Sequence, residues 1–253
     1  MVYLLRRRDG LTREAFHDYW LNHHGPLVAG AATHLGLLRH VQVHTVEDDM
    51  NEAMAKARGG MESIYDGVAE YWWENEAALM AALGTEEGRT AIQLLLADER
   101  AFIDLPASPL WLAREYPQVN PTPENIVASV KSSILKLHFP LRHLEGRDPD
   151  EVRGYWLQNH GPIIRSHAPA SGILRYVQVH RLEHPVEARL REERGTAVEP
   201  YLGHAEVWLS RDRVATPEAR VAGRAAVEDE SRFIDFARST MFVAKEHVIV
   251  DRR

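Results

Sequence analysis

The sequence contains no cysteine among its 253 residues. This absence excludes disulfide bonds, thiolate nucleophiles and metal sites built on cysteine. No apolar run approaches the roughly 20 residues that a helix needs to cross a bilayer, so we expect no membrane contact. The opening segment MVYLLRRR lacks the order of a secretory signal, in which positive charge precedes a longer apolar stretch. We therefore expect a cytoplasmic protein.

Positive charge is also scarce. The 30 Lys and Arg residues are outnumbered by 37 Asp and Glu, which gives a net charge of −7. Proteins that bind nucleic acid usually carry a basic patch or stripe, so we expect no nucleic-acid partner. The phosphate-binding patterns GxGxxG and GxxxxGK[ST], the hydrolase pattern GxSxG and the metal-binding pattern HExxH do not occur either. We accordingly predict no metal and no organic cofactor.

What the chain does contain is an internal repeat. Residues 11–48 match residues 147–184 at an offset of 136 positions, as from Tyr19 to Tyr155. Farther on the offset falls to 131, where DERAFID from Asp98 matches DESRFID from Asp229. Two copies of a half-sized unit indicate an internal pseudo-dimer. A site between the copies of such a chain can be asymmetric, which a true homodimer cannot easily achieve.

Hydrophobic periodicity and turn residues predict the same order of elements, β-α-β-β-α-β, in each copy. We expect the first helix of each copy to end at a Gly-Pro pair, Gly25-Pro26 or Gly161-Pro162. This order is that of a ferredoxin-like repeat, so we expect an α+β fold. The boundaries predict one repeat at residues 1–117, a linker at 118–130 that is rich in Pro and Asn, and a second repeat at 131–253. Helices would cover only one face of each antiparallel sheet. We therefore expect the two sheets to face each other and form an intramolecular α/β barrel.

Three short motifs carry a resemblance to a known family. They are FHDYWLNHHGPLV from Phe16, GYWLQNHGPII from Gly154 and the two DExxFID segments from Asp98 and Asp229. In order and spacing, the chain resembles the EthD family of dimeric α/β-barrel proteins over nearly its whole length. Relatives in that superfamily include monooxygenases, isomerases and dehydratases, many of which act on apolar ring compounds without a metal or organic cofactor. The duplication inside one chain departs from the usual single-domain homodimer.

Strand alternation predicts which side chains face the barrel interior. In the second strand of the second copy, Arg175, Val177 and Val179 share one face, while Tyr176, Gln178 and His180 share the other. We expect the largely apolar set to pack beneath the helices and the polar set to point into the barrel. The same reasoning adds His40, Gln42, His44, Val68, Glu70, Trp72, Lys136, His138, His204, Glu206 and Trp208 to the interior.

We hypothesise a catalytic group in the second copy, because His204 stands where the first copy has Val68. Its members are His180, Glu206, His204 and Tyr176. A histidine would abstract a proton near neutral pH, Glu206 would orient it, and Tyr176 or Gln178 would hold an oxyanion. The residues expected to contact substrate are His24, His160, His44, Gln42, Gln178, Glu70, Trp72, Trp208 and His138.

Other interpretations of these residues stay open. The interior polar groups can equally bridge the two sheets as a hydrogen-bonded lock that fixes the register of the pseudo-dimer, or lie in solvent. His24 and His160 either reach the mouth of a pocket or interact with the carbonyl groups and dipole at a helix C-terminus.

The function that we expect is a cofactor-independent enzyme of the lyase or dehydratase, isomerase or monooxygenase type. It would act by acid–base chemistry on a small, apolar molecule of aromatic or polyketide-like character. The alternative is a non-catalytic small-molecule-binding or accessory protein of a degradation pathway. Exposed helix faces and sheet edges would also allow a homodimer of pseudo-dimers.

Overall fold

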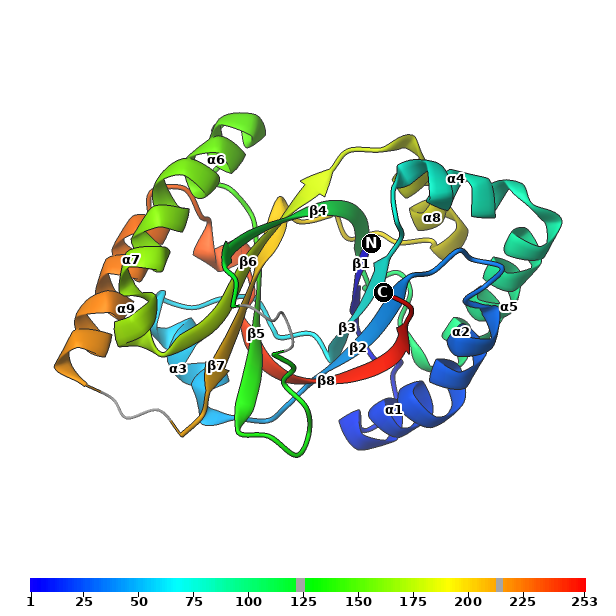
Figure 1. Cartoon of the computed structure of the whole chain (residues 1–253), viewed down its shortest axis with the longest axis horizontal. Helices are drawn as coiled ribbons and strands as arrows, with labels where there is room; N and C mark the ends of the chain where they lie inside the picture. The colour runs from blue at the N-terminus through cyan, green and yellow to red at the C-terminus, as the bar shows by residue number, and fades with distance from the viewer. Residues whose placement is uncertain (122–125, 213–215) are drawn as a thin grey trace.

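The computed structural model describes residues 1–121, 126–212 and 216–253. Within these residues, eight antiparallel strands close into one barrel in the order β1-β3-β2-β8-β5-β7-β6-β4, with helices on two opposite sides (Figure 1). The strands are β1 (Val2–Leu5), β2 (Arg39–Thr45), β3 (Gly67–Trp72), β4 (Leu110–Val119), β5 (Ile134–Leu141), β6 (Ile173–Leu182), β7 (Gly203–Ser210) and β8 (Phe242–Asp251). The predicted α+β barrel is thereby confirmed.

The helices form two groups around this barrel. The first half of the chain (residues 1–117) contributes α1 (Arg13–Tyr19), η1 (Trp20–His24), α2 (Gly25–Ala31), α3 (Asp49–Ala57), α4 (Glu76–Gly84) and α5 (Glu86–Phe102). The second half (residues 131–253) contributes α6 (Pro149–Tyr155), η2 (Trp156–His160), α7 (Gly161–Ser171), α8 (Pro185–Arg194), α9 (Pro217–Glu230) and η3 (Phe236–Arg238). None of these helices is long and apolar enough to cross a membrane.

Each half supplies four adjacent strands. The first half gives the order β4-β1-β3-β2 and the second half the matching order β8-β5-β7-β6. Two seams, β2 with β8 and β4 with β6, join the halves and leave the barrel without a free edge. The predicted linker at 118–130 begins inside β4, and its residues 122–125 lie outside the described part of the chain.

The first long helix of each half does not stop at its Gly-Pro pair, so the prediction of a helix end there was wrong. Helix α1 begins directly after the cap residue Thr12, whose side chain accepts a hydrogen bond from the Ala15 amide. The chain then widens into the π-helical turn η1 and continues as α2. Pro26 lies directly after this turn, at the start of α2.

A glutamine from the sheet stabilises each π-helical turn. Gln42 Nε2 donates to the Trp20 carbonyl at 2.8 Å, and Gln178 Nε2 donates to the Trp156 carbonyl at 2.9 Å. A Cβ atom on Gly25 would lie 3.2 Å from Gln42 Nε2, which is tighter than ordinary packing. The glycine of the His-Gly-Pro motif therefore makes room for the glutamine that bonds to the turn.

Helices α3 and α8 are exchanged between the halves (Figure 1). Val186 and Leu190 of α8 belong to the core beneath the helices of the first half. Met50 and Met54 of α3 pack against the core of the second half. Two buried ion pairs accompany the exchange. Arg194 contacts Glu99 at 2.9 Å, and Arg58 contacts Glu230 at 2.7 Å. Each half is therefore completed by a helix of the other.

Candidate functional site

The barrel interior contains a buried cluster of charged side chains. Lys136 Nζ lies 2.5 Å from Glu70 Oε1, 3.1 Å from Glu206 Oε2 and 3.5 Å from Glu246 Oε1. Glu246 also accepts hydrogen bonds from Trp208 Nε1 at 2.9 Å and from the Ala128 amide at 2.7 Å. The sequence reasoning missed Glu246, although its alternation with Phe242 and Ala244 on β8 places it on the inward face. Lys136 of the second half thus contacts Glu70 of the first.

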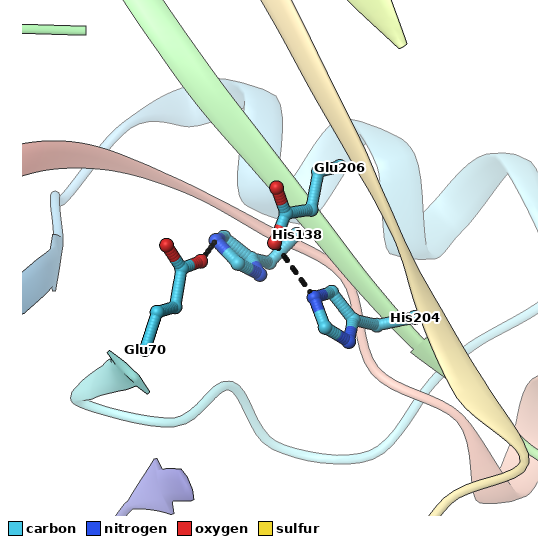
Figure 2. A group of neighbouring side chains, drawn as sticks. All are labelled: Glu70, His138, His204 and Glu206. Carbon is cyan, nitrogen blue, oxygen red and sulfur yellow. Dashed lines mark hydrogen bonds and ion pairs between the residues drawn. The ribbon is translucent and has the colours of Figure 1, made fainter. Parts of the chain in front are cut away.

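Two histidines lie beside these carboxylates (Figure 2). His204 Nε2 is 2.8 Å from Glu206 Oε1. His138 Nε2 is 3.2 Å from Glu70 Oε1, which is within ion-pair distance but not aligned as a hydrogen bond. The two imidazole rings stack with their centroids 5.2 Å apart.

The environment separates the pKa values of the two carboxyl groups. Burial raises the pKa of Glu70 well above its usual range, and the neighbouring Glu206 carboxylate raises it further. Burial would also raise the pKa of Glu206, but the Lys136 ammonium and the hydrogen bond from His204 lower it well below its usual range. For His138, burial and the Lys136 charge lower the pKa well below its usual range, so the imidazole is neutral.

The face predicted for the second strand of each copy was wrong. Val177 and Val179 of β6 pack inside the barrel, whereas Tyr176 belongs to the core beneath the helices. His180 stacks on Trp156 of the π-helical turn, with ring centroids 4.5 Å apart, and its Nε2 is 3.0 Å from Gln178 Oε1. The predicted group of His180, Tyr176, His204 and Glu206 is therefore divided between the two faces of the sheet.

The first half repeats this arrangement. His44 stacks on Trp20 at 4.6 Å, Gln42 bonds to the Trp20 carbonyl, and His40 stacks on Tyr71 at 4.2 Å. The physical reason is that both faces of β2 and β6 are buried, so polarity alone does not distinguish them. The π-helical turn provides polar and aromatic partners on the helix side, and the valines fill the interior.

His24 and His160 each bond to the aspartate of the DExxFID motif of their own half. His24 Nδ1 is 2.7 Å from Asp98 Oδ2, and His160 Nδ1 is 2.8 Å from Asp229 Oδ2. The other oxygen of each aspartate accepts a hydrogen bond from Tyr19 or Tyr155. A carboxylate at Nδ1 requires the proton on that nitrogen and leaves Nε2 as the basic nitrogen of a neutral ring. The sequence reasoning missed this pairing, although both motifs occur twice.

A cavity of about 910 Å³ lies between the outer face of the second-half sheet and helices α3, α7 and α9. Two predicted site residues, His160 and Tyr176, line it. Most of the remaining wall is apolar and includes Met54, Leu137, Phe139, Ile164, Val207, Leu209 and Ile234. The Tyr176 hydroxyl accepts hydrogen bonds from Trp156 Nε1 at 3.2 Å and Gln178 Nε2 at 3.1 Å. Burial raises the pKa of Tyr176, so the phenol stays protonated.

The two halves differ in the residues that fill this region. At the offsets of the repeat, Tyr71, Ile92 and Leu95 correspond to Val207, Gly223 and Ala226. Tyr71 and Leu95 are buried in the first-half core, and Ile92 packs against it. All three of their smaller counterparts line the cavity of the second half. Loss of side-chain volume at these positions explains why the second half has a large cavity here.

A second cavity, of about 390 Å³, opens at one end of the barrel. Glu70 and Glu206 of the charged cluster line it, and so does Trp72. Glu74 and Glu115 add further carboxylates, beside Arg114. The interior cluster is therefore in contact with a cavity although its members are buried.

The chain was compared with protein-family models, curated protein sequences and solved structures. A family model described as EthD domain matches residues 8–106 and 144–237, and thus both copies of the repeat. A comparison with curated protein sequences gave no significant match. Two solved structures are similar to the chain, and each is described as a "putative monooxygenase". The one from Lactobacillus acidophilus NCFM has 8% identity and a TM-score of 0.46, over 99% of this chain and 94% of its own. The one from Fusobacterium nucleatum subsp. nucleatum ATCC 25586 has 7% identity and a TM-score of 0.49, over 98% of this chain and 91% of its own.

Proposed function

This chain belongs to the EthD family, and we propose that it is a cofactor-independent acid–base enzyme whose active site is the cavity of its second half. In this proposal, two ferredoxin-like repeats, at residues 1–117 and 131–253, are joined by the linker 118–130 and have different roles. The first half supports the barrel and contributes α3 to the cavity wall. The second half binds and transforms the substrate.

The observation that carries the proposal is that His160, whose Nδ1 is bonded to Asp229, lies in the wall of a large apolar cavity. A volume of about 910 Å³ lies within the range of sites that enclose a small organic molecule. The mainly apolar wall suits a ring compound with few polar groups. A small number of polar groups among apolar ones is what orients a substrate in such sites.

The arrangement supports proton transfer. Asp229 holds Nδ1 of His160, so Nε2 can take a proton from a substrate carbon next to a carbonyl group. The protonated Tyr176 hydroxyl would donate a hydrogen bond to the oxygen on which negative charge develops. Return of the proton to a leaving hydroxyl releases water and forms a double bond, which is a dehydration. Return to another carbon gives an isomerisation.

We assign the base to His160 rather than to His180, His204 or Glu206. His180 stacks against Trp156 beneath the helices, while His204 and Glu206 bond to each other inside the barrel. The described lining of the cavity of about 910 Å³ includes Tyr176 and His160 but none of these three residues.

The two histidine–aspartate pairs make a matched experiment possible. Compounds that displace the fluorescent probe 8-anilinonaphthalene-1-sulfonate would first be selected from aromatic and polyketide-like ring compounds. Their conversion would then be followed by liquid chromatography and mass spectrometry. We expect His160→Asn to keep ligand affinity and to lower turnover by about 10²- to 10⁴-fold, the usual contribution of a general base. His24→Asn removes the equivalent pair of the first half and should keep turnover within about twofold of the wild-type rate.

Two other outcomes are informative. Equal losses of melting temperature, with unchanged turnover in both variants, would assign both pairs a purely structural role and reject the proposal. Tight binding without any conversion by the wild-type protein would favour the alternative of a non-catalytic binding or accessory protein, which the apolar cavity also supports.

A further inference from the structure

We propose that the barrel interior binds one divalent first-row transition-metal ion through Glu70, His138, His204 and Glu206. This site is separate from the proposed active site, which lies on the other face of the sheet. The four side chains converge from β3, β5 and β7 (Figure 2).

The donor set and its geometry support a metal site. Each residue offers one ligand atom, and the four atoms all lie within 4.8 Å of one another. Ligand atoms of a tetrahedral zinc site lie about 3.4 Å apart, so the side-chain ends would move inward by about 1 Å. Two imidazoles with two carboxylates suit Zn²⁺, Fe²⁺ or Mn²⁺, whereas Ca²⁺ and Mg²⁺ prefer sites made of oxygen alone.

Buried polar atoms without hydrogen-bond partners support a cation-binding role for this cluster. His138 is fully buried, and neither of its ring nitrogens has a hydrogen-bond partner among the residues that the structure describes. His204 Nδ1 and Glu70 Oε2 are buried and also lack one. A buried polar atom that loses its water without gaining a partner destabilises the folded state. Figure 2 shows His138 between Glu70 and Glu206, where coordination of a cation would satisfy its imidazole.

The charges in the interior favour a cation of charge two. Three carboxylates, Glu70, Glu206 and Glu246, surround the single ammonium group of Lys136. Without a further cation, the three carboxyl groups cannot all be ionised at low cost in a buried site. A divalent ion on Glu70 and Glu206 would leave Glu246 as the partner of Lys136.

The cavity of about 390 Å³ provides a route to the site. Glu70 and Glu206 line it together with Glu74, Glu76 and Glu115, and the basic groups in its wall are Arg114 and the N-terminal amine of Met1, whose pKa burial lowers to about 5. A cavity lined mainly by groups of one sign concentrates counter-ions, here cations. The metal would connect the halves, since Glu70 belongs to the first and the other three ligands to the second.

The test is a titration of the full-length protein with Zn²⁺ after treatment with EDTA and dialysis. Calorimetry and metal analysis should give one ion per chain, and the melting temperature should rise with Zn²⁺ concentration. Mg²⁺ and Ca²⁺ should not reproduce the shift. His138→Asn and His204→Asn should each weaken binding at least about a hundredfold, since even loss of an outer partner costs ten- to hundredfold. His44→Asn, a change to another buried imidazole on the opposite face of the sheet, should leave binding unchanged.

Unchanged Zn²⁺ binding in both His138→Asn and His204→Asn would overturn the proposal and place the ion on surface histidines such as His23. If these variants do not fold, Co²⁺ bound to the wild-type protein decides the question. Four-coordinate Co²⁺ gives strong visible absorption bands, and their absence at saturating Co²⁺ would reject the site. None of these measurements depends on catalytic activity, so the metal site and the proposed function can fail independently.

Discussion

The substitution Ala226→Leu is the sharpest test of the second-half cavity. It places in α9 the residue that the first half has at the corresponding position, Leu95. Leu95 is buried in the first-half core, whereas Ala226 lines the cavity. The variant therefore fills space in the second half with a side chain that the same architecture already accommodates in the first.

The expected gain in stability follows from the added apolar volume. Leucine adds three carbon atoms to alanine, which at about 0.8 kcal/mol per buried methylene gives at most about 2.4 kcal/mol. Because Ala226 is only partly buried, we expect the free energy of unfolding to rise by about 1–2 kcal/mol. For a chain of this length, the melting temperature should increase by about 2–8 °C.

Calorimetric or fluorescence melting measures the stability, and titration with 8-anilinonaphthalene-1-sulfonate measures access to the cavity. The variant should bind the probe at least about tenfold more weakly, a loss of about 1.4 kcal/mol. A destabilisation of about 1–3 kcal/mol would instead be the result of overpacking. That outcome, with probe binding unchanged, would refute the existence of the cavity and the comparison of the two halves.

Three further predictions concern buried ionisable side chains. Arg194→Met should destabilise the protein by about 3–5 kcal/mol, because it leaves the Glu99 carboxylate buried without its partner. A loss of stability below about 1 kcal/mol, measured by urea unfolding, would contradict the role of this pair in the helix exchange. Lys136→Met should lower the free energy of unfolding by a similar amount at pH 7.5, because Glu70, Glu206 and Glu246 lose their shared ammonium group. Unchanged unfolding curves would show that the cluster does not stabilise the barrel. Burial, with a contribution from Arg153, lowers the pKa of His180 from 6.5 to about 4. The unfolded chain therefore binds more protons between these values, and stability present above pH 6.5 is lost as the pH falls toward 4, by about 3 kcal/mol. His180→Phe should remove that part of the acid sensitivity, and an unchanged stability–pH profile would contradict it.

The barrel could be predicted from the sequence because its signals are repeated and local. The duplicated motifs gave the two halves, and alternation on β3, β5 and β7 correctly placed Glu70, His138, His204 and Glu206 in the interior. Each of these strands carries a clearly apolar set for the helix side, such as Leu135 and Leu137 on β5. The faces predicted from alternation on these strands therefore agree with the faces observed in the structure.

The second strands could not be assigned in the same way. On β2 and β6 both faces are buried, and the polar set is satisfied by a π-helical turn that the sequence pattern does not reveal. Because the Gly-Pro pair predicts a helix end, the bonds of Gln42 and Gln178 to the π-helical turns could not be predicted. The exchange of α3 and α8 depends on how loops cross between the halves, which is a property of the whole fold.

The cavity was visible in the sequence only through a comparison of the copies. The pairs Tyr71 and Val207, Ile92 and Gly223, and Leu95 and Ala226 each replace a large side chain by a small one. Their common effect becomes evident only when the structure brings β7 and α9 together. Divergence between repeats is thus a signal for a site that neither copy shows alone.

A crystal structure of the protein with a brominated aromatic ring compound, selected by probe displacement, would show directly where the substrate binds. We expect anomalous density for bromine between the outer face of β5 and β7 and helices α7 and α9. A polar atom of the ligand should lie within hydrogen-bond distance of His160 Nε2. Bromine in the barrel interior or beneath the first-half helices, with the second-half cavity empty, would contradict the assignment of the active site.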